Sequence, residues 1–171
     1  AQANAIADAT NGVVTAIVAA DTAAKLVTAL EDVAGGLDVL TLKVNGATAA
    51  ALDLINLNTN KTAGKITVDA KEIIGTAANV TTVLTDAGND FIGEEKAAVK
   101  VTAPAAVADV NAILAATTGV VTATVNSGAA TALVAGLTNA TAKDKLTLTV
   151  TNEAAAALTN AADLLALDGK T

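Results

Sequence analysis

Apolar and polar residues alternate with a period of two in six short segments of the chain. Such alternation is typical of a β-strand that buries one face. The segments begin roughly 22–33 residues apart, which is the spacing of the units in a solenoid. The six predicted strands are Val13–Val18, Val39–Val44, Lys65–Asp69, Ala98–Thr102, Val120–Val125 and Lys145–Val150.

Alanine-rich stretches lie between the strands, with apolar residues at positions i, i+3, i+4 and i+7. This spacing predicts helices with one buried face. Gly12 and Gly119 directly follow two such stretches, so we expect each to end its helix in the left-handed conformation. Two stretches that show the spacing are Ala23, Leu26, Val27 and Leu30, and Ala130, Leu133, Val134 and Leu137.

The order of strand, helix and strand predicts a parallel sheet with right-handed crossovers. Within each strand the apolar residues occupy one face, and threonine and lysine occupy the other. This pattern favours helices on a single face of the sheet. We therefore predict an α/β fold, a one-sided solenoid of about six βα units with parallel strands. A doubly wound parallel sheet is the alternative.

A longer repeat relates the beginning of the chain to its last third. The segment NAIADATNGVVTAIV at Asn4–Val18 returns as NAILAATTGVVTATV at Asn111–Val125, about 107 residues later. The strand LTLKV at Leu40–Val44 returns as LTLTV at Leu146–Val150. We interpret residues 1–171 as a single repeat array. Its first period is residues 1–107, and its partial second period is residues 108–171.

The composition argues against several classes of function. The 171 residues are 53% hydrophobic and 16% charged, with a formal charge of −7 and neither histidine nor cysteine. A histidine base, a disulfide and a thiolate metal site are therefore impossible, and we predict that the protein is not an enzyme. Ten lysines against seventeen carboxylates, with one aromatic ring, predict no nucleic-acid partner. The apolar runs are too short for membrane insertion.

One segment suggests a metal site. Asp86–Gly93 reads DAGNDFIG and resembles part of the calcium-binding nonapeptide of RTX-type repeats. Asp86, Asn89 and Asp90 are the candidate ligands, because carboxylate and amide oxygens suit calcium. The alternative is an Asx-rich turn after a helix. We expect no other cofactor.

A column of polar residues is predicted on the open face of the sheet. Regular threonine arrays of this kind are candidates for binding glycan, mineral or ice. The simpler explanation is that threonine favours strands and tolerates water. The residues expected at matching positions on consecutive strands are Thr15, Thr41, Thr67, Lys100, Thr122 and Thr147.

Neither end of the chain has the polar character of a capping repeat. The first helical stretch repeats an internal one, and the last is rich in leucine. We therefore expect both ends to contact further units of the array or another copy of the chain. The residues expected at these interfaces are Ile6, Ala9, Val13, Leu164, Leu165 and Leu167.

Three segments resemble the tandem repeats of giant bacterial surface proteins, of the cyanobacterial, adhesin-like type. They are TGVVTATV at Thr118–Val125, ADLLALDGKT at Ala162–Thr171 and VDAKEIIGTAANVTTVL at Val68–Leu84. The resemblance implies an extracellular or cell-surface location and supplies no functional residue. The leading hypothesis is a structural segment of an extracellular filament, sheath or surface layer. The alternative is an adhesin stalk that binds through its Thr/Lys face, with calcium as a possible aid.

Overall fold

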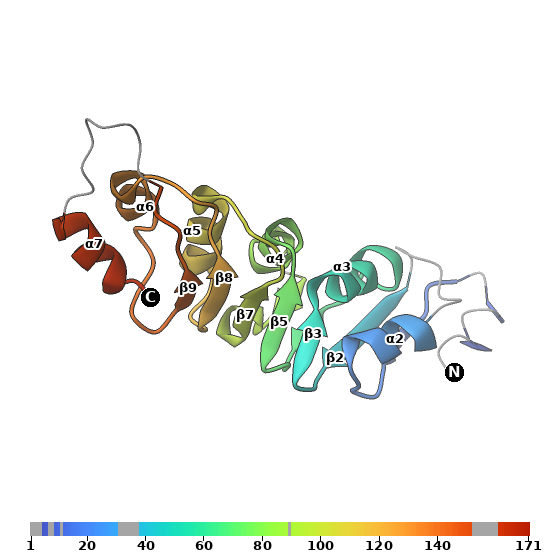
Figure 1. Ribbon diagram of the computed structural model, residues 1–171. Coiled ribbons are helices and arrows are strands. Elements are labelled where there is room, and N and C mark those ends of the chain that lie inside the picture. The colour runs from blue at the N-terminus through green and yellow to red at the C-terminus, as the bar shows by residue number, and fades with distance from the viewer. Residues whose placement is uncertain (1–4, 7–8, 11, 31–37, 89, 152–160) are drawn as a thin grey trace.

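Strands and helices follow one another in sequence order along an elongated molecule (Figure 1). The computed structural model describes residues 5–6, 9–10, 12–30, 38–88, 90–151 and 161–171. Every strand pairing in these ranges is parallel. The predicted α/β class with parallel strands is therefore confirmed. We use the word unit for a strand segment together with the helix that follows it.

The strands form two sheets instead of the single row that the sequence predicts. The first sheet has the order β1 (Thr15–Ile17), β2 (Val39–Val44), β4 (Ile66–Val68) and β6 (Phe91–Ile92). The second has the order β3 (Thr48–Ala50), β5 (Glu72–Gly75), β7 (Ala98–Val101), β8 (Val121–Thr124) and β9 (Lys145–Thr147).

The six predicted strands are all present, but they are divided between the sheets. The first three become β1, β2 and β4, whereas the last three become β7, β8 and β9 of the second sheet. In the middle of the chain β2, β4 and β6 of the first sheet are each followed, after a short bend, by a strand of the second sheet. Gly46 lies in the first of these bends and has a φ of 116°, which glycine adopts readily. The sequence patterns missed β3, β5 and β6, because their sequences TAA, EIIG and FI do not alternate apolar and polar residues.

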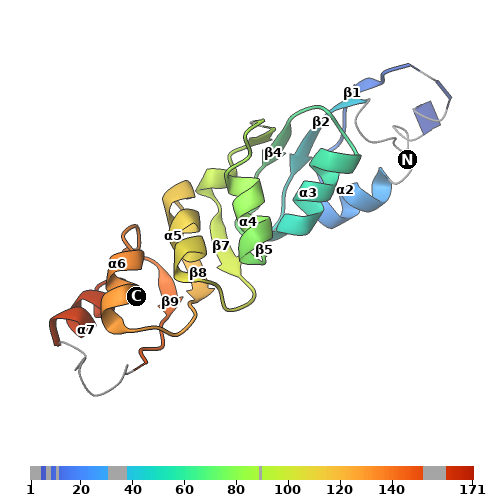
Figure 2. The same cartoon turned by 90° about the horizontal axis from the view of Figure 1, so that it is seen from above.

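The helices pack on one another in sequence order, and Figure 2 shows α3, α4 and α5 in a row. Each buries at least one apolar side chain, as α3 does with Leu54 and Leu57 and α5 does with Val110 and Ile113. The helices are α2 (Ala23–Ala29), α3 (Ala51–Asn60), α4 (Ala77–Leu84), α5 (Val107–Ala116), α6 (Ala130–Gly136) and α7 (Ala161–Asp168), and a 3₁₀ turn, η1, covers Glu94–Lys96.

Strand register places buried apolar side chains of neighbouring units beside each other. Leu42 pairs with Ile66 in the first sheet, and Val99 pairs with Ile73 and Val121 in the second. All five side chains are buried. Burial contributes about 25 cal/mol for each Å² of apolar surface, so each unit gains much of its stability from its neighbours.

The expected role of Gly119 as a helix cap is wrong. Among the described glycines only Gly46 and Gly93 have positive φ. Gly119 instead lies against the preceding unit, where an added Cβ would collide with the carbonyl oxygen of Ala97. The requirement for glycine at this position therefore comes from a distant part of the chain.

Candidate functional site

The buried polar side chains of the described residues lie where one unit contacts the next. They are Asp38, Thr62, Thr117 and Asp144, and each stands shortly before a strand. A buried polar group must form hydrogen bonds if the fold is to remain stable. All four do so with the backbone of a neighbouring unit, so the contacts between units are the chemically distinctive feature of the molecule. We call these contacts joints.

The first kind of joint uses a threonine followed two residues later by glycine, which we call a TxG segment. The Thr62 hydroxyl accepts from the Leu40 N–H at 2.8 Å and the Gly64 N–H at 2.7 Å, and donates to the Leu40 carbonyl at 2.9 Å. An added Cβ at Gly64 would collide with that same carbonyl oxygen. Thr62 and Gly64 therefore both contact the backbone of Leu40 in β2.

The same arrangement recurs at a second TxG segment. The Thr117 hydroxyl accepts from the Gly119 N–H at 3.0 Å and donates to the carbonyls of Glu95 at 2.9 Å and Ala97 at 3.3 Å. These carbonyls belong to the preceding unit. The TxG segment is therefore a repeated device for joining units.

The second kind of joint uses an aspartate just before a strand. Asp38 accepts from the Val14 N–H at 2.8 Å, and Asp144 accepts from the Val121 N–H at 2.9 Å. The second oxygen of Asp144 also accepts from the N–H and the hydroxyl of Thr141, at 3.0 and 2.9 Å. A carboxylate thereby satisfies a backbone donor at the start of the previous strand.

The joint between β1 and β2 recurs one long period later between β8 and β9. Two backbone hydrogen bonds accompany the aspartate contact in each case, and their partners occupy matching positions of the repeat. The bonds are Val18 N–H to Thr41 carbonyl (3.1 Å) and Asp21 N–H to Lys43 carbonyl (3.3 Å), then Val125 N–H to Thr147 carbonyl (3.0 Å) and Gly128 N–H to Thr149 carbonyl (3.1 Å). The sequence repeat thus corresponds to a repeat of atomic contacts.

Sequence reasoning did not identify any of these joint residues. The signal was present, since T-x-G precedes a predicted strand three times, at residues 10–12, 62–64 and 117–119. An aspartate also precedes matching strands at Asp38 and Asp144. Both patterns are short and consist of polar residues or glycine, so the spacing of the hydrophobic residues does not reveal them.

The residues expected at the ends differ in exposure. Ile6, Val13, Leu164 and Leu165 are exposed at 55%, 62%, 46% and 73%, and Ala9 is exposed as well. Leu167 is buried at 5%, because it faces the core from α7. Exposed apolar side chains therefore occur in both the first and the last described units.

The expected threonine column does not form. Thr41 pairs with Ile17 in the first sheet, not with Thr15, which pairs with Val39. Thr67 pairs with Lys43 and Ile92. In the second sheet Lys100, Thr122 and Lys145 adjoin one another, and Thr147 pairs with Thr124. Of the expected column only Lys100 and Thr122 occupy matching positions. The other predicted matches are wrong, because strands with similar sequences pair with an offset and divide between two sheets.

The acidic turn uses its side chains within the protein. The Asp86 carboxylate accepts from the Asp90 N–H at 2.6 Å, and Asp90 forms an ion pair with Lys65 at 3.2 Å. Asn89 lies outside the described residues. No group of three or more acidic, histidine or cysteine side chains suited to a metal occurs in the described ranges. Asp86 thus stabilises the turn, and Asp90 joins it to Lys65 of the preceding unit.

Glu94 is the exception among the carboxylates near this turn. Its Oε2 atom is buried without a hydrogen-bond partner among the described residues. Burial raises the pKa of Glu94, and the nearby charges of Glu95 and Asp86 raise it further, although a backbone hydrogen bond acts in the opposite direction. Ionised Glu94 therefore destabilises the fold locally.

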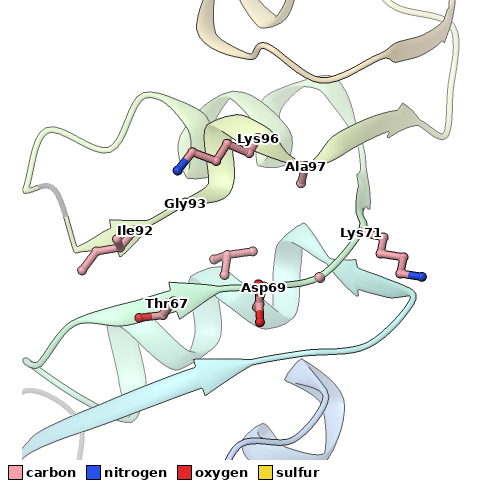
Figure 3. Close-up of a pocket in the computed structure, with 9 residues that line it drawn as sticks. Thr67, Asp69, Lys71, Ile92, Gly93, Lys96 and Ala97 are labelled. Carbon is pink, nitrogen blue, oxygen red and sulfur yellow. The ribbon is translucent and has the colours of Figure 1, made fainter.

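A hollow of about 360 Å³ lies beside the bend between β4 and β5 (Figure 3). Lys71 and Lys96 stand on its two sides, and Ile92 and Gly93 form part of its wall. Asp69 is its one acidic lining residue and pairs with Lys43 at 3.0 Å. The lining has no nucleophile activated by a neighbouring base, so we assign no catalytic chemistry to it.

Comparisons with family models, with curated proteins and with solved structures find no match for this chain. Among the described residues, no helix is both long and apolar enough to cross a membrane.

Proposed function

We propose that this chain is a structural segment of an extracellular filament, sheath or surface layer, built as a solenoid of stacked units that associates end to end. The observation that carries the proposal is the recurrence of the β1–β2 joint at β8–β9. The same aspartate and backbone contacts hold both pairs of units together. An array whose joints repeat can be extended without new chemistry.

The distribution of polar groups supports a structural role over a catalytic one. The four buried polar side chains of the described residues all serve joints between units. A solenoid also exposes an apolar cross-section at each end unless a polar repeat covers it. Val13 and Leu165, at 62% and 73% exposure, are apolar side chains that a further unit or a second copy would cover. The resemblance of three segments to bacterial surface repeats supports the extracellular location.

Association of the purified chain in solution tests the proposal. Sedimentation velocity over a range of protein concentrations should show oligomers that grow with concentration, and negative-stain electron microscopy should show them as linear particles. A chain that remains monomeric at every concentration, or that forms compact closed oligomers, would contradict end-to-end association.

A binding module is the second candidate. Its support is the outer surface of both sheets, where Thr41, Lys100 and Thr147 are exposed. Because the threonines do not form a continuous column, this support is weaker than that for the structural role. The substitutions Thr41→Lys and Thr122→Lys test it in assays of binding to glycan, mineral and ice. Unchanged binding would exclude the threonine face.

A further inference from the structure

The bend between β2 and β3 contains one of the two Asn–Gly pairs of the sequence, Asn45 and Gly46. Asn45 is partly exposed and Gly46 is exposed. The other pair is Asn11 and Gly12, and Asn11 lies outside the described residues. The structure therefore shows the surroundings of a complete Asn–Gly pair at Asn45.

The backbone nitrogen of Gly46 is not held by a hydrogen bond. Within the described part of the chain, neither this N–H nor the Asn45 side chain forms a hydrogen bond or an ion pair. The adjoining backbone groups are engaged, because the Asn45 N–H donates to the Asp21 carbonyl at 3.0 Å. The Gly46 carbonyl accepts from the Lys71 N–H at 3.2 Å. A reaction of the Gly46 nitrogen with the Asn45 side chain thus requires no hydrogen bond of either group to be broken.

Two other asparagines provide a contrast. Asn79 precedes Val80, whose N–H donates to the carbonyl of the α4 N-cap at 3.0 Å. Asn139 precedes Ala140, whose N–H donates to a carbonyl three residues earlier at 3.3 Å. In both cases the nitrogen that follows asparagine is bonded, and its residue carries a side chain that shields it. Gly46 has no Cβ, so the Asn45 side chain can approach its nitrogen closely.

We infer that Asn45 is a self-modifying site, at which the Gly46 nitrogen attacks the carbonyl carbon of the Asn45 side chain. The new N–C bond closes a succinimide ring, and the Asn45 amide nitrogen leaves as ammonia with the proton of the Gly46 N–H. Water then opens the ring at either of its carbonyls, which leaves aspartate or isoaspartate at position 45. The net reaction is hydrolysis of the side-chain amide by water, so it needs neither an enzyme nor a cofactor.

The bend that contains Asn45 matches the bend of the next unit in length. Before the two bends, Val44 pairs with Val68. After them, Thr48 pairs with Glu72, so both bends contain the same number of residues. Isoaspartate routes the main chain through the side-chain CH₂ group and lengthens the first bend alone. We therefore expect it to weaken the backbone hydrogen bonds between the two bends.

The third bend, between β6 and β7, shows the effect of unequal lengths. Thr67 pairs with Ile92 before the second and third bends. Glu72 pairs with Ala98 after them, so the third bend is one residue longer than the second. The hollow of about 360 Å³ is lined by residues of exactly these two bends. A longer bend thus leaves a gap between neighbouring units, and conversion of Asn45 should loosen the boundary between the units of β2 and β4 as the protein ages.

Peptide mass mapping of an Asn11→Gln chain aged at mildly alkaline pH tests the site, because this background removes the other Asn–Gly pair. Asn45 should convert from amide to carboxyl at least tenfold faster than Asn79 and Asn139. In urea this contrast should narrow, since unfolding frees the nitrogens that follow Asn79 and Asn139. Equal rates in the folded protein would overturn the inference. A contrast of the same size in urea would overturn the part assigned to the fold.

Hydrogen exchange of the aged chain tests the loosening. The isoaspartate form, separated by ion exchange, should exchange the Lys71 amide several-fold faster than the fresh chain. Asn45→Gln is the matched control, because its longer side chain closes the ring less readily, and its exchange should not change with age. Unchanged exchange at Lys71 in the isoaspartate form would overturn the loosening. The inference does not rest on the proposed association, so a chain that converts but stays monomeric would contradict only the proposed function.

Discussion

Thr62 and Leu40 hold each other across the boundary between two units. The Leu40 N–H donates to the Thr62 hydroxyl at 2.8 Å, and that hydroxyl donates back to the Leu40 carbonyl at 2.9 Å. One buried side chain thus satisfies both backbone groups of a residue 22 positions away. A backbone edge that would otherwise be left unpaired in the core becomes a specific contact between units.

Thr62→Val should destabilise the protein by about 2–4 kcal/mol, because it leaves the buried N–H groups of Leu40 and Gly64 without an acceptor. Urea unfolding measures the change. Thr28→Val is the matched control, since the Thr28 hydroxyl only donates to Ala24 on an exposed helix face. It should change the free energy of unfolding by less than about 0.5 kcal/mol. Equal effects of the two substitutions would show that the Thr62 contact contributes no stability.

Gly64→Ala should reduce stability by about 1–3 kcal/mol, since the new Cβ collides with the Leu40 carbonyl and forces the two strands apart. Thermal unfolding is a suitable measurement. Gly128→Ala makes only ordinary contacts and should remain within about 0.5 kcal/mol of the original chain. A Gly64→Ala protein as stable as the control would show that the two strands separate easily.

Asp144→Ala removes the acceptor for three donors, the Val121 N–H and both donors of Thr141. We expect a loss of about 2–3 kcal/mol and faster hydrogen exchange at the Val121 amide. Asp144→Asn keeps one acceptor oxygen and should lose less. Asp109→Ala removes an exposed carboxylate from the first turn of α5, so its effect should stay below about 1 kcal/mol. Unchanged exchange at Val121 in Asp144→Ala would contradict the assigned joint.

Glu94→Gln should stabilise the protein at neutral pH. Burial raises the pKa of Glu94 in the folded state, so the folded state binds this proton more tightly than the unfolded chain does. The ionised carboxylate therefore destabilises the fold above the folded pKa, and this penalty disappears as the pH falls below the unfolded pKa. The gain from Gln should be well under about 1 kcal/mol, because the side chain is partly exposed and screened by solvent.

Unfolding curves of Glu94→Gln and the original chain at neutral and acidic pH test this sign. The two proteins should differ at neutral pH and converge in acid. Glu95→Gln, which removes the same charge one residue away, controls for net charge. A difference that is largest in acid would contradict the assignment.

The positions of the longer elements could be predicted from the sequence, because they depend on contacts within a few residues. The alternation in LTLKV places the buried Leu40, Leu42 and Val44 on one face of β2, as the structure confirms. The apolar spacing around Leu133 likewise marks α6, which covers Ala130–Gly136. Local periodicity therefore determined the α/β class, six of the nine described strands and most helices.

The division into two sheets was decided by tertiary structure. β2 and β8 have similar alternation, yet they belong to different sheets, because their neighbours along the axis differ. The bend at Gly46 and the two-residue β6 have no repeating pattern of their own. They form because the preceding unit supplies an edge on which a short strand can pair.

The joints were decided by tertiary structure as well. Gly119 was assigned to a helix end from its local position, although the carbonyl of Ala97 is what requires a glycine there. Thr62 and Asp144 act on backbone groups 22 and 23 residues away. The sequence by itself determined the positions of the strands and helices that show a hydrophobic period, since that period is a local property. Only the stacked fold brings these distant backbone groups together, because a buried hydrogen bond depends on contact in space and not on proximity along the chain.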